Sequence, residues 1–216
     1  MEHHEHKKAF QIERLILFSD AVFAIAITLL VIELHLPDLS ENSNHGLLEA
    51  MVHTIPHFIS FVISFMIIGI YWIAHHRMFY YLTDYDSRTL WLNLLLLFFI
   101  AMMPFSSNIY GIHFDLDAAY FLYFLNISMI SYFFYRMYVH ISKPEKKLRK
   151  GLENPRLVSY YKWRSLVVPI CFGIGVGLSV LLTSPGLKMM SRMAPMLIFI
   201  GMRIIRKRYA DVVNIS

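Results

Sequence analysis

Long apolar runs alternate with short polar connections along the whole chain. Each run is close to the roughly 20 residues that a helix needs to cross about 30 Å of hydrocarbon. The six runs cover about residues 15–36, 53–80, 90–109, 118–139, 166–183 and 189–205. The pattern predicts an all-α, polytopic membrane protein with six transmembrane helices, forming a single domain over residues 1–216.

The composition agrees with this class. Hydrophobic residues make up 57% of the 216 residues and charged residues only 16%, whereas soluble domains carry about 25% charged residues. Tyr, Phe and Trp together make up 15%, as expected where aromatic rings lie at membrane interfaces. An ordinary soluble domain is therefore excluded.

The net charge of +5 is unevenly distributed. The connections at residues 37–56 and 111–117 contain no Lys or Arg, whereas the connection at 142–162 and the C-terminal tail are rich in both. Because basic connections stay in the cytoplasm, this distribution predicts that both termini are cytoplasmic. Lys188 and Arg192 alone oppose it. We expect the basic residues to meet membrane lipids and not nucleic acid.

The first run carries an aliphatic stripe. Ile25, Leu29 and Ile32 recur at helical spacing. Thr28 lies at the edge of the same face. In a run that is apolar almost throughout, periodicity alone favours packing or lipid contact over a pore lining.

The same run also carries a carboxylate. Asp20 points about 140° away from Ile25 on a helix. Carboxylates inside membranes usually face the bundle interior and find a partner. Asp20 is therefore either a structural hydrogen-bond hub or a proton or ion site.

The second run offers partners for Asp20. Trp72 and His76 are i, i+4 neighbours on one helix face. An antiparallel second helix would bring that face level with Asp20, and His76 could then donate a hydrogen bond to it. The alternative is a secondary transporter with Asp20 or His76 as proton relay, but no inverted repeat or pair of broken helices supports it.

Three other features have ordinary explanations. Glu33 is expected at a solvated rim, and the stretch PFSSN at 104–108 is expected to kink or end a helix. His3, His4 and His6 are interpreted as a solvated tail, so no metal site is predicted. No nucleotide motif or HExxH-type site is present. We therefore expect no enzyme activity, no cofactor and no small-molecule substrate.

The motif Arg14-x-x-x-Phe18-Ser19-Asp20 resembles the R-x-x-x-F-S-D signature of the transmembrane protein 175 family of potassium channels. The continuation AVFAIAITLLVIEL is similar to the first helix of that family. The resemblance implies a bacterial member in the plasma membrane, with one six-helix unit per chain. It further implies a homotetramer whose first helices line a central pore.

The resemblance changes the interpretation of the stripe. It implies that Ile25 forms a hydrophobic constriction and that Leu29 and Ile32 form further apolar layers. Thr28 would supply a hydroxyl layer linked to potassium preference. Ala24 departs from human-type members, which carry Ser there, so the degree of selectivity stays open. The implied function is a leak-type, potassium-preferring cation channel, with K⁺ as the permeant ion.

The resemblance also implies a role for the polar residues of the first two helices. Arg14, Ser19, Asp20, Trp72 and His76 would form a network that fixes the first helix against the second. On this interpretation Asp20 points away from the pore and holds the pore helix in place.

Overall fold

The computed structural model describes residues 2–34, 43–143, 148 and 154–213, and this part of the chain folds into helices. The elements are α1 (Glu2–Ile32), α2 (Asn44–Tyr80), α3 (Ser87–Ala101), α4 (Met103–Ile112), α5 (Asp117–Ile141), α6 (Pro155–Leu181), α7 (Pro185–Ser191), the 3-10 turn η2 (Ala194–Met196), α8 (Leu197–Arg208) and α9 (Ala210–Val213). The predicted all-α fold is confirmed.

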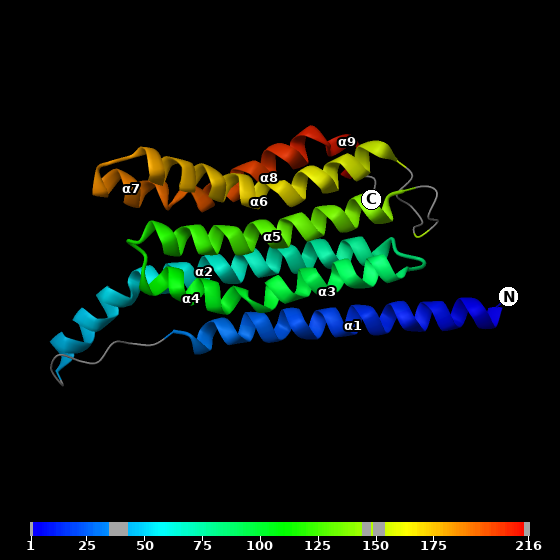
Figure 1. The fold of residues 1–216 in the computed structure, drawn as a ribbon, viewed down its shortest axis with the longest axis horizontal. Helices are drawn as coiled ribbons and strands as arrows, with labels where there is room; N and C mark the ends of the chain where they lie inside the picture. The colour runs from blue at the N-terminus through cyan, green and yellow to red at the C-terminus, as the bar shows by residue number, and fades with distance from the viewer. Residues whose placement is uncertain (1, 35–42, 144–147, 149–153, 214–216) are drawn as a thin grey trace.

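The long helices lie side by side in one elongated bundle (Figure 1). α1 forms one edge and packs on α2, α3 and α4. α5 lies between α3 and α6, and α6 packs on α8 at the opposite edge. Within a single chain, α1 therefore has its neighbours on one side.

Five segments of the described chain are long and apolar enough to cross a membrane, whereas six were expected. They are Lys8–Ile32, Asn44–Tyr80, Ser87–Ile112, Asp117–Ile141 and Pro155–Leu181. The expected sixth span at about 189–205 is not one helix, because α7, η2 and α8 divide it into pieces that pack along α6. Pro195 explains the division, since it has no N–H for a continuous helix and restricts the residue before it.

The second span is longer than expected. α2 begins at Asn44 and not near His53, and Ser43 caps it by accepting a hydrogen bond from the Gly46 amide at 3.1 Å. Its 37 residues extend roughly 55 Å at 1.5 Å per residue, more than the hydrocarbon thickness. The first turns of α2 accordingly project beyond the end of α1 (Figure 1).

Lys188 and Arg192, the two exceptions to the predicted charge distribution, are paired with an acid. The ammonium of Lys188 lies 2.9 Å from one carboxylate oxygen of Asp117, and the guanidinium of Arg192 lies 2.9 Å from the other. Arg192 is buried and also donates to the Asp115 carbonyl at 2.7 Å. These charges tie α7 to the start of α5, so their position follows from a local structural role.

The third span bends where the sequence predicts a kink. α3 ends at Ala101 and α4 starts at Met103, with Pro104 in its first turn. The hydroxyls that follow are used inside the bundle. Ser107 shares hydrogen bonds with Ser60 and Ser64 of α2, and Ser64 also bonds the Tyr123 hydroxyl of α5 at 2.6 Å. The hydroxyl groups near the break thus link α2, α4 and α5.

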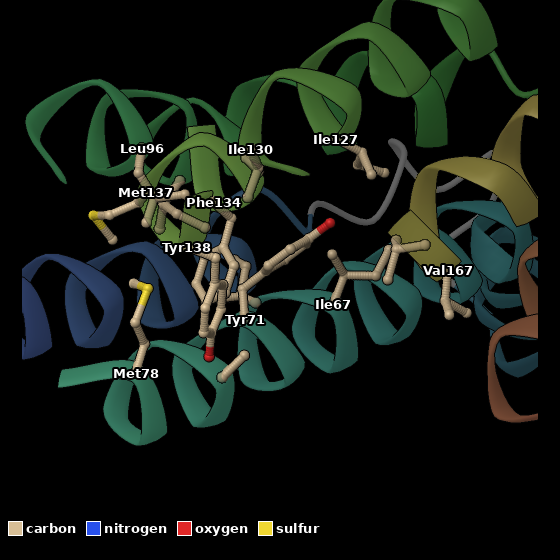
Figure 2. Packing of buried hydrophobic residues seen from close by; sticks show 14 of the residues in the cluster. Ile67, Tyr71, Met78, Leu96, Ile127, Ile130, Phe134, Met137, Tyr138 and Val167 are labelled. Atoms are coloured by element: carbon tan, nitrogen blue, oxygen red, sulfur yellow. The ribbon is translucent and has the colours of Figure 1, made fainter. Parts of the chain in front are cut away.

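Large aromatic side chains fill the centre of the bundle (Figure 2). The rings of Tyr71 on α2 and Phe134 on α5 lie 5.9 Å apart, and Phe134 lies 5.3 Å from Tyr138. All three side chains are at most 2% exposed. The Tyr71 hydroxyl is hydrogen-bonded to Ser131, because a buried polar group without a partner would be costly.

The connection between α2 and α3 ends in a helix cap. Asp86 accepts hydrogen bonds from the Thr89 amide and from His140 of α5, both at 2.9 Å. Partial burial alone would raise the pKa of Asp86, but these hydrogen bonds outweigh it and lower the pKa below its ordinary value. A charged N-cap thereby holds the start of α3 against the end of α5.

Candidate pore face and its anchor

α1 has two distinct faces. The buried face, at most 7% exposed, packs against the bundle and consists of Ile12, Ser19, Phe23, Ala26 and Leu30. In the most apolar 18-residue stretch of α1 only 22% is buried, against 33–50% in the corresponding stretches of the other four candidate spans. α1 is therefore the least enclosed of the membrane-length helices.

The predicted stripe lies on the other face. Ile25, Leu29 and Ile32 are 58%, 40% and 62% exposed, and Thr28 is exposed as well. By helical geometry Ile25 and Ile32 point about 160° to 180° away from Phe23. Among the described residues, the whole stripe is thus left largely uncovered.

The Thr28 side chain has a defined hydrogen-bond geometry. Its hydroxyl lies 2.9 Å from the Ile25 carbonyl and 3.1 Å from the Ala24 carbonyl, donating back into its own helix. A hydroxyl oxygen keeps acceptor lone pairs when its proton is engaged in this way. Thr28 therefore presents an oxygen that can coordinate a cation on the exposed face.

Asp20 is held by α2, but not through the residue expected. The indole nitrogen of Trp72 donates to the Asp20 carboxylate at 3.0 Å. His76 was expected to be the donor; instead it is exposed, and its ring lies 6.1 Å from the Trp72 ring. The longer indole reaches the carboxylate from one turn nearer the middle of α2, so Asp20 joins α1 to α2 through Trp72, and His76 does not contribute to that bond.

A second, buried chain of polar groups was only partly anticipated. Ser19 accepts a hydrogen bond from the Asn93 amide at 2.9 Å, and the Asn93 carbonyl oxygen lies 2.9 Å from His75 Nε2. All three side chains are fully buried. Asn93 was not among the predicted site residues, although an amide inside the Leu-rich third span is itself a signal of interior contact.

The signature motif divides between the two faces of α1. Ser19 and Asp20 hold the helix, whereas Phe18 is 51% exposed and Arg14 is exposed. In the described part of the chain, no hydrogen bond or ion pair joins Arg14 to α2. Arg14 and Ile25 are 11 residues apart, so they share one side of the helix. Arg14 thus extends the exposed face and is not part of the anchor.

Further contacts hold both ends of α1. At one end, Asn108 of α4 donates to the Glu33 carboxylate at 2.6 Å, so Glu33 is more than a solvated rim residue. At the other end, the Lys8 ammonium lies 2.5 Å from Asp84 and lowers the pKa of that carboxyl. α1 is therefore fixed along its length on one side only.

The described residues contain no group of three or more His, Cys, Asp or Glu placed to hold a metal ion. The side chains of His3, His4 and His6 lie outside the described part. The candidate functional site is therefore the exposed face of α1, together with the contacts that hold α1 against the bundle.

Comparison with known proteins agrees with this arrangement. A family model described as "Endosomal/lysosomal potassium channel TMEM175" matches residues 14–104. A potassium channel of Chamaesiphon minutus is 33% identical over 143 residues, covering 63% of this chain and 69% of the relative. The chain belongs to the TMEM175 family.

Other matches define the extent of the likeness. A potassium channel of Streptomyces collinus is 41% identical over 87 residues, which span 40% of this TMEM175 chain and 41% of the relative's own length. The crystal structure of a lysosomal potassium-selective channel TMEM175 homolog from Chamaesiphon minutus matches with a TM-score of 0.69 at 23% identity, covering 92% of this chain and 98% of that one. The second match supports the fold across nearly the whole chain.

Proposed function

We propose that this TMEM175-family protein is a leak-type, potassium-preferring cation channel, a homotetramer in a bacterial plasma membrane with both termini cytoplasmic. One observation carries the proposal: Ile25, Thr28, Leu29 and Ile32 all lie on the face of α1 that no other helix covers in the described part of the chain. The names of the bacterial relatives as potassium channels support the same activity.

Four copies of this face around an axis would create a narrow pore with alternating chemistry. Rings of Ile25, Leu29 and Ile32 would exclude water and form a gate by dewetting. The ring of Thr28 oxygens would replace part of the hydration shell of a passing cation. K⁺ is less strongly hydrated than Na⁺, so a site that only partly replaces hydration water favours it.

A proton-coupled transporter is the weaker candidate. Its proposed relay would join Asp20 and His76, but Asp20 accepts its hydrogen bond from Trp72 and not from His76. An indole N–H is a donor only and has no lone pair to accept a proton, so it cannot pass a proton on. Asp20 therefore suits an anchor better than a relay.

The test is ion flux into liposomes that contain the purified protein, with K⁺ and Na⁺ gradients imposed separately. Wild type is compared with Thr28→Ala, which removes the coordinating oxygen, and Ile25→Asn, which makes the constriction polar. Ile174→Asn is the matched control, because Ile174 is 46% exposed in the middle of α6. A pH gradient applied to the same vesicles measures proton entry.

We expect K⁺ flux above Na⁺ flux in wild type, a smaller difference in Thr28→Ala and faster flux in Ile25→Asn. Ile174→Asn should behave as wild type. Folded tetramers without flux in any variant would refute the channel. Equal effects of the two Ile→Asn changes would refute the placement of the pore.

A further inference from the structure

A basic cavity lies at the end of the bundle where α2 ends and α6 begins. It has a volume of about 590 Å³ and lies between α2, α6 and α8. It is lined by Arg77, Arg164, Arg206 and His76 and by four tyrosines: Tyr80, Tyr81, Tyr160 and Tyr161. A cavity of this size matches the range of small-molecule sites.

The charge of this cavity is not balanced by its own walls. Of the described residues that line it, none is Asp or Glu. No ion pair joins Arg77, Arg164 or Arg206 to an acid within the described part of the chain. Three guanidinium groups that converge on one hollow repel each other, so the arrangement favours a bound anion.

Arg164 supplies the most specific observation. Its Nη1 nitrogen is buried and has no hydrogen-bond partner among the described residues. The same is true of the Tyr138 hydroxyl, which lines a small hollow together with Arg164 and Tyr161. Buried donors without partners are costly, and an anion in the larger cavity that accepts from Arg164 would remove the cost there.

The chemistry of the walls defines the anion. Guanidinium groups bind phosphate in a bidentate manner, and tyrosine hydroxyls donate further hydrogen bonds. The inner wall contains the apolar side chains of Ile70 and Met202, which suit the carbon part of an organic phosphate. We propose that this cavity binds a phosphate group, supplied by the head group of an anionic lipid or by a soluble phosphate compound.

The site is independent of the proposed pore. Its residues lie on α2, α6 and α8, and α6 and α8 form the edge of the bundle opposite α1 (Figure 1). The proposed pore face is the exposed side of α1, which points away from the bundle. Binding can therefore be measured without ion flux, and a failure of one proposal leaves the other standing.

The experiment measures the apparent melting temperature of the full-length protein in neutral detergent during titration with three probes. These are dioleoyl phosphatidylglycerol, dioleoyl phosphatidylcholine and glycerol phosphate, the last compared with NaCl of equal ionic strength. Wild type is compared with Arg164→Gln and with the double variant Arg77→Gln/Arg206→Gln, whose residues are exposed and so leave folding intact. Arg208→Gln is the matched control, since Arg208 is an exposed residue of α8 that does not line the cavity.

We expect phosphatidylglycerol to stabilise wild type and Arg208→Gln more than phosphatidylcholine does. Both cavity variants should bind at least about tenfold more weakly, since hydrogen bonds between charged groups are lost. Stabilisation by glycerol phosphate as well would assign a soluble source, and stabilisation by the lipid alone would assign a head group. Absence of any stabilisation, or equal weakening in Arg208→Gln and the cavity variants, would overturn the proposal.

Discussion

At the residue scale, the hydrogen bond between the carboxylate of Asp20 and the indole of Trp72 is one of the contacts that hold α1 in position. The bond is 3.0 Å long and joins α1 to α2 in a partly exposed setting. Because one partner is charged, the bond is stronger than a neutral one. Its loss should loosen α1 without unfolding the bundle.

Trp72→Phe keeps an aromatic ring but removes the donor to Asp20. We expect this change to destabilise the protein by about 1 kcal/mol, seen as a lower apparent melting temperature in detergent. Trp91→Phe serves as the control, because Trp91 is 66% exposed on α3 and makes no hydrogen bond in the described part of the chain. A larger decrease for Trp91→Phe would contradict the role given to Trp72.

The buried chain of Ser19, Asn93 and His75 leads to a stronger prediction. Asn93→Ala leaves His75 Nε2 without its partner in the interior, and an unsatisfied buried group costs about 1–3 kcal/mol. We expect poor yield or a clear loss of thermal stability. The neighbouring Leu94→Ala, at a 44% exposed position, should change stability much less; equal losses would show that the buried chain adds nothing.

At the scale of elements, α2 and α4 approach closely where the third span has bent. A Cβ added to Gly111 of α4 would lie 3.1 Å from the backbone Cα of His57 on α2. The bend after Met102 thus brings two backbones together at a residue that has no side chain. The hydroxyl links of Ser107 join the same pair of helices.

Gly111→Ala should therefore force α4 away from α2 and destabilise the protein by about 1–3 kcal/mol. The control is Gly177→Ala in α6, where no atom lies within 4 Å of the added Cβ and the higher helix propensity of Ala stabilises by up to about 1 kcal/mol. Thermal melts of both variants give the comparison. Equal melting temperatures would mean that the close approach is not maintained.

At the scale of the whole molecule, the proposed tetramer would cover the face of α1 that is exposed in one chain. Closed cyclic symmetry is the rule for soluble oligomers of one chain, and the same logic of closure would surround the stripe with three further copies. The aliphatic stripe would then lie at an axis and not against lipid.

A cross-linking experiment tests this arrangement. In a Cys171→Ala background, Ile25→Cys should allow a short bis-maleimide to join subunits, giving a dimer band on a denaturing gel. Ile174→Cys on α6 should give monomers, since that face would meet lipid. Cross-linking at Ile174 with none at Ile25 would place a different helix at the axis.

Much of this architecture could be predicted from the order of residues alone. Hydrophobic runs near the length of a membrane crossing predict spanning helices, because lipid offers no partners for backbone polar groups. That physical rule placed five spans near their observed positions, and the Pro104 kink followed from the missing N–H of proline. The stripe from Ile25 to Ile32 was visible because helical periodicity is a local property.

The tertiary structure decided what periodicity could not. Partner choice depends on side-chain reach across helices, so Trp72 rather than His76 bonds Asp20, and Asn93 completes a buried chain. Pro195 breaks the sixth run, but the positions of the resulting pieces depend on how α7 and α8 pack along α6 and on the pairing of Arg192 with Asp117. Which face of α1 stays uncovered is likewise a property of the bundle, since in an almost wholly apolar helix only the neighbours distinguish one face from the other.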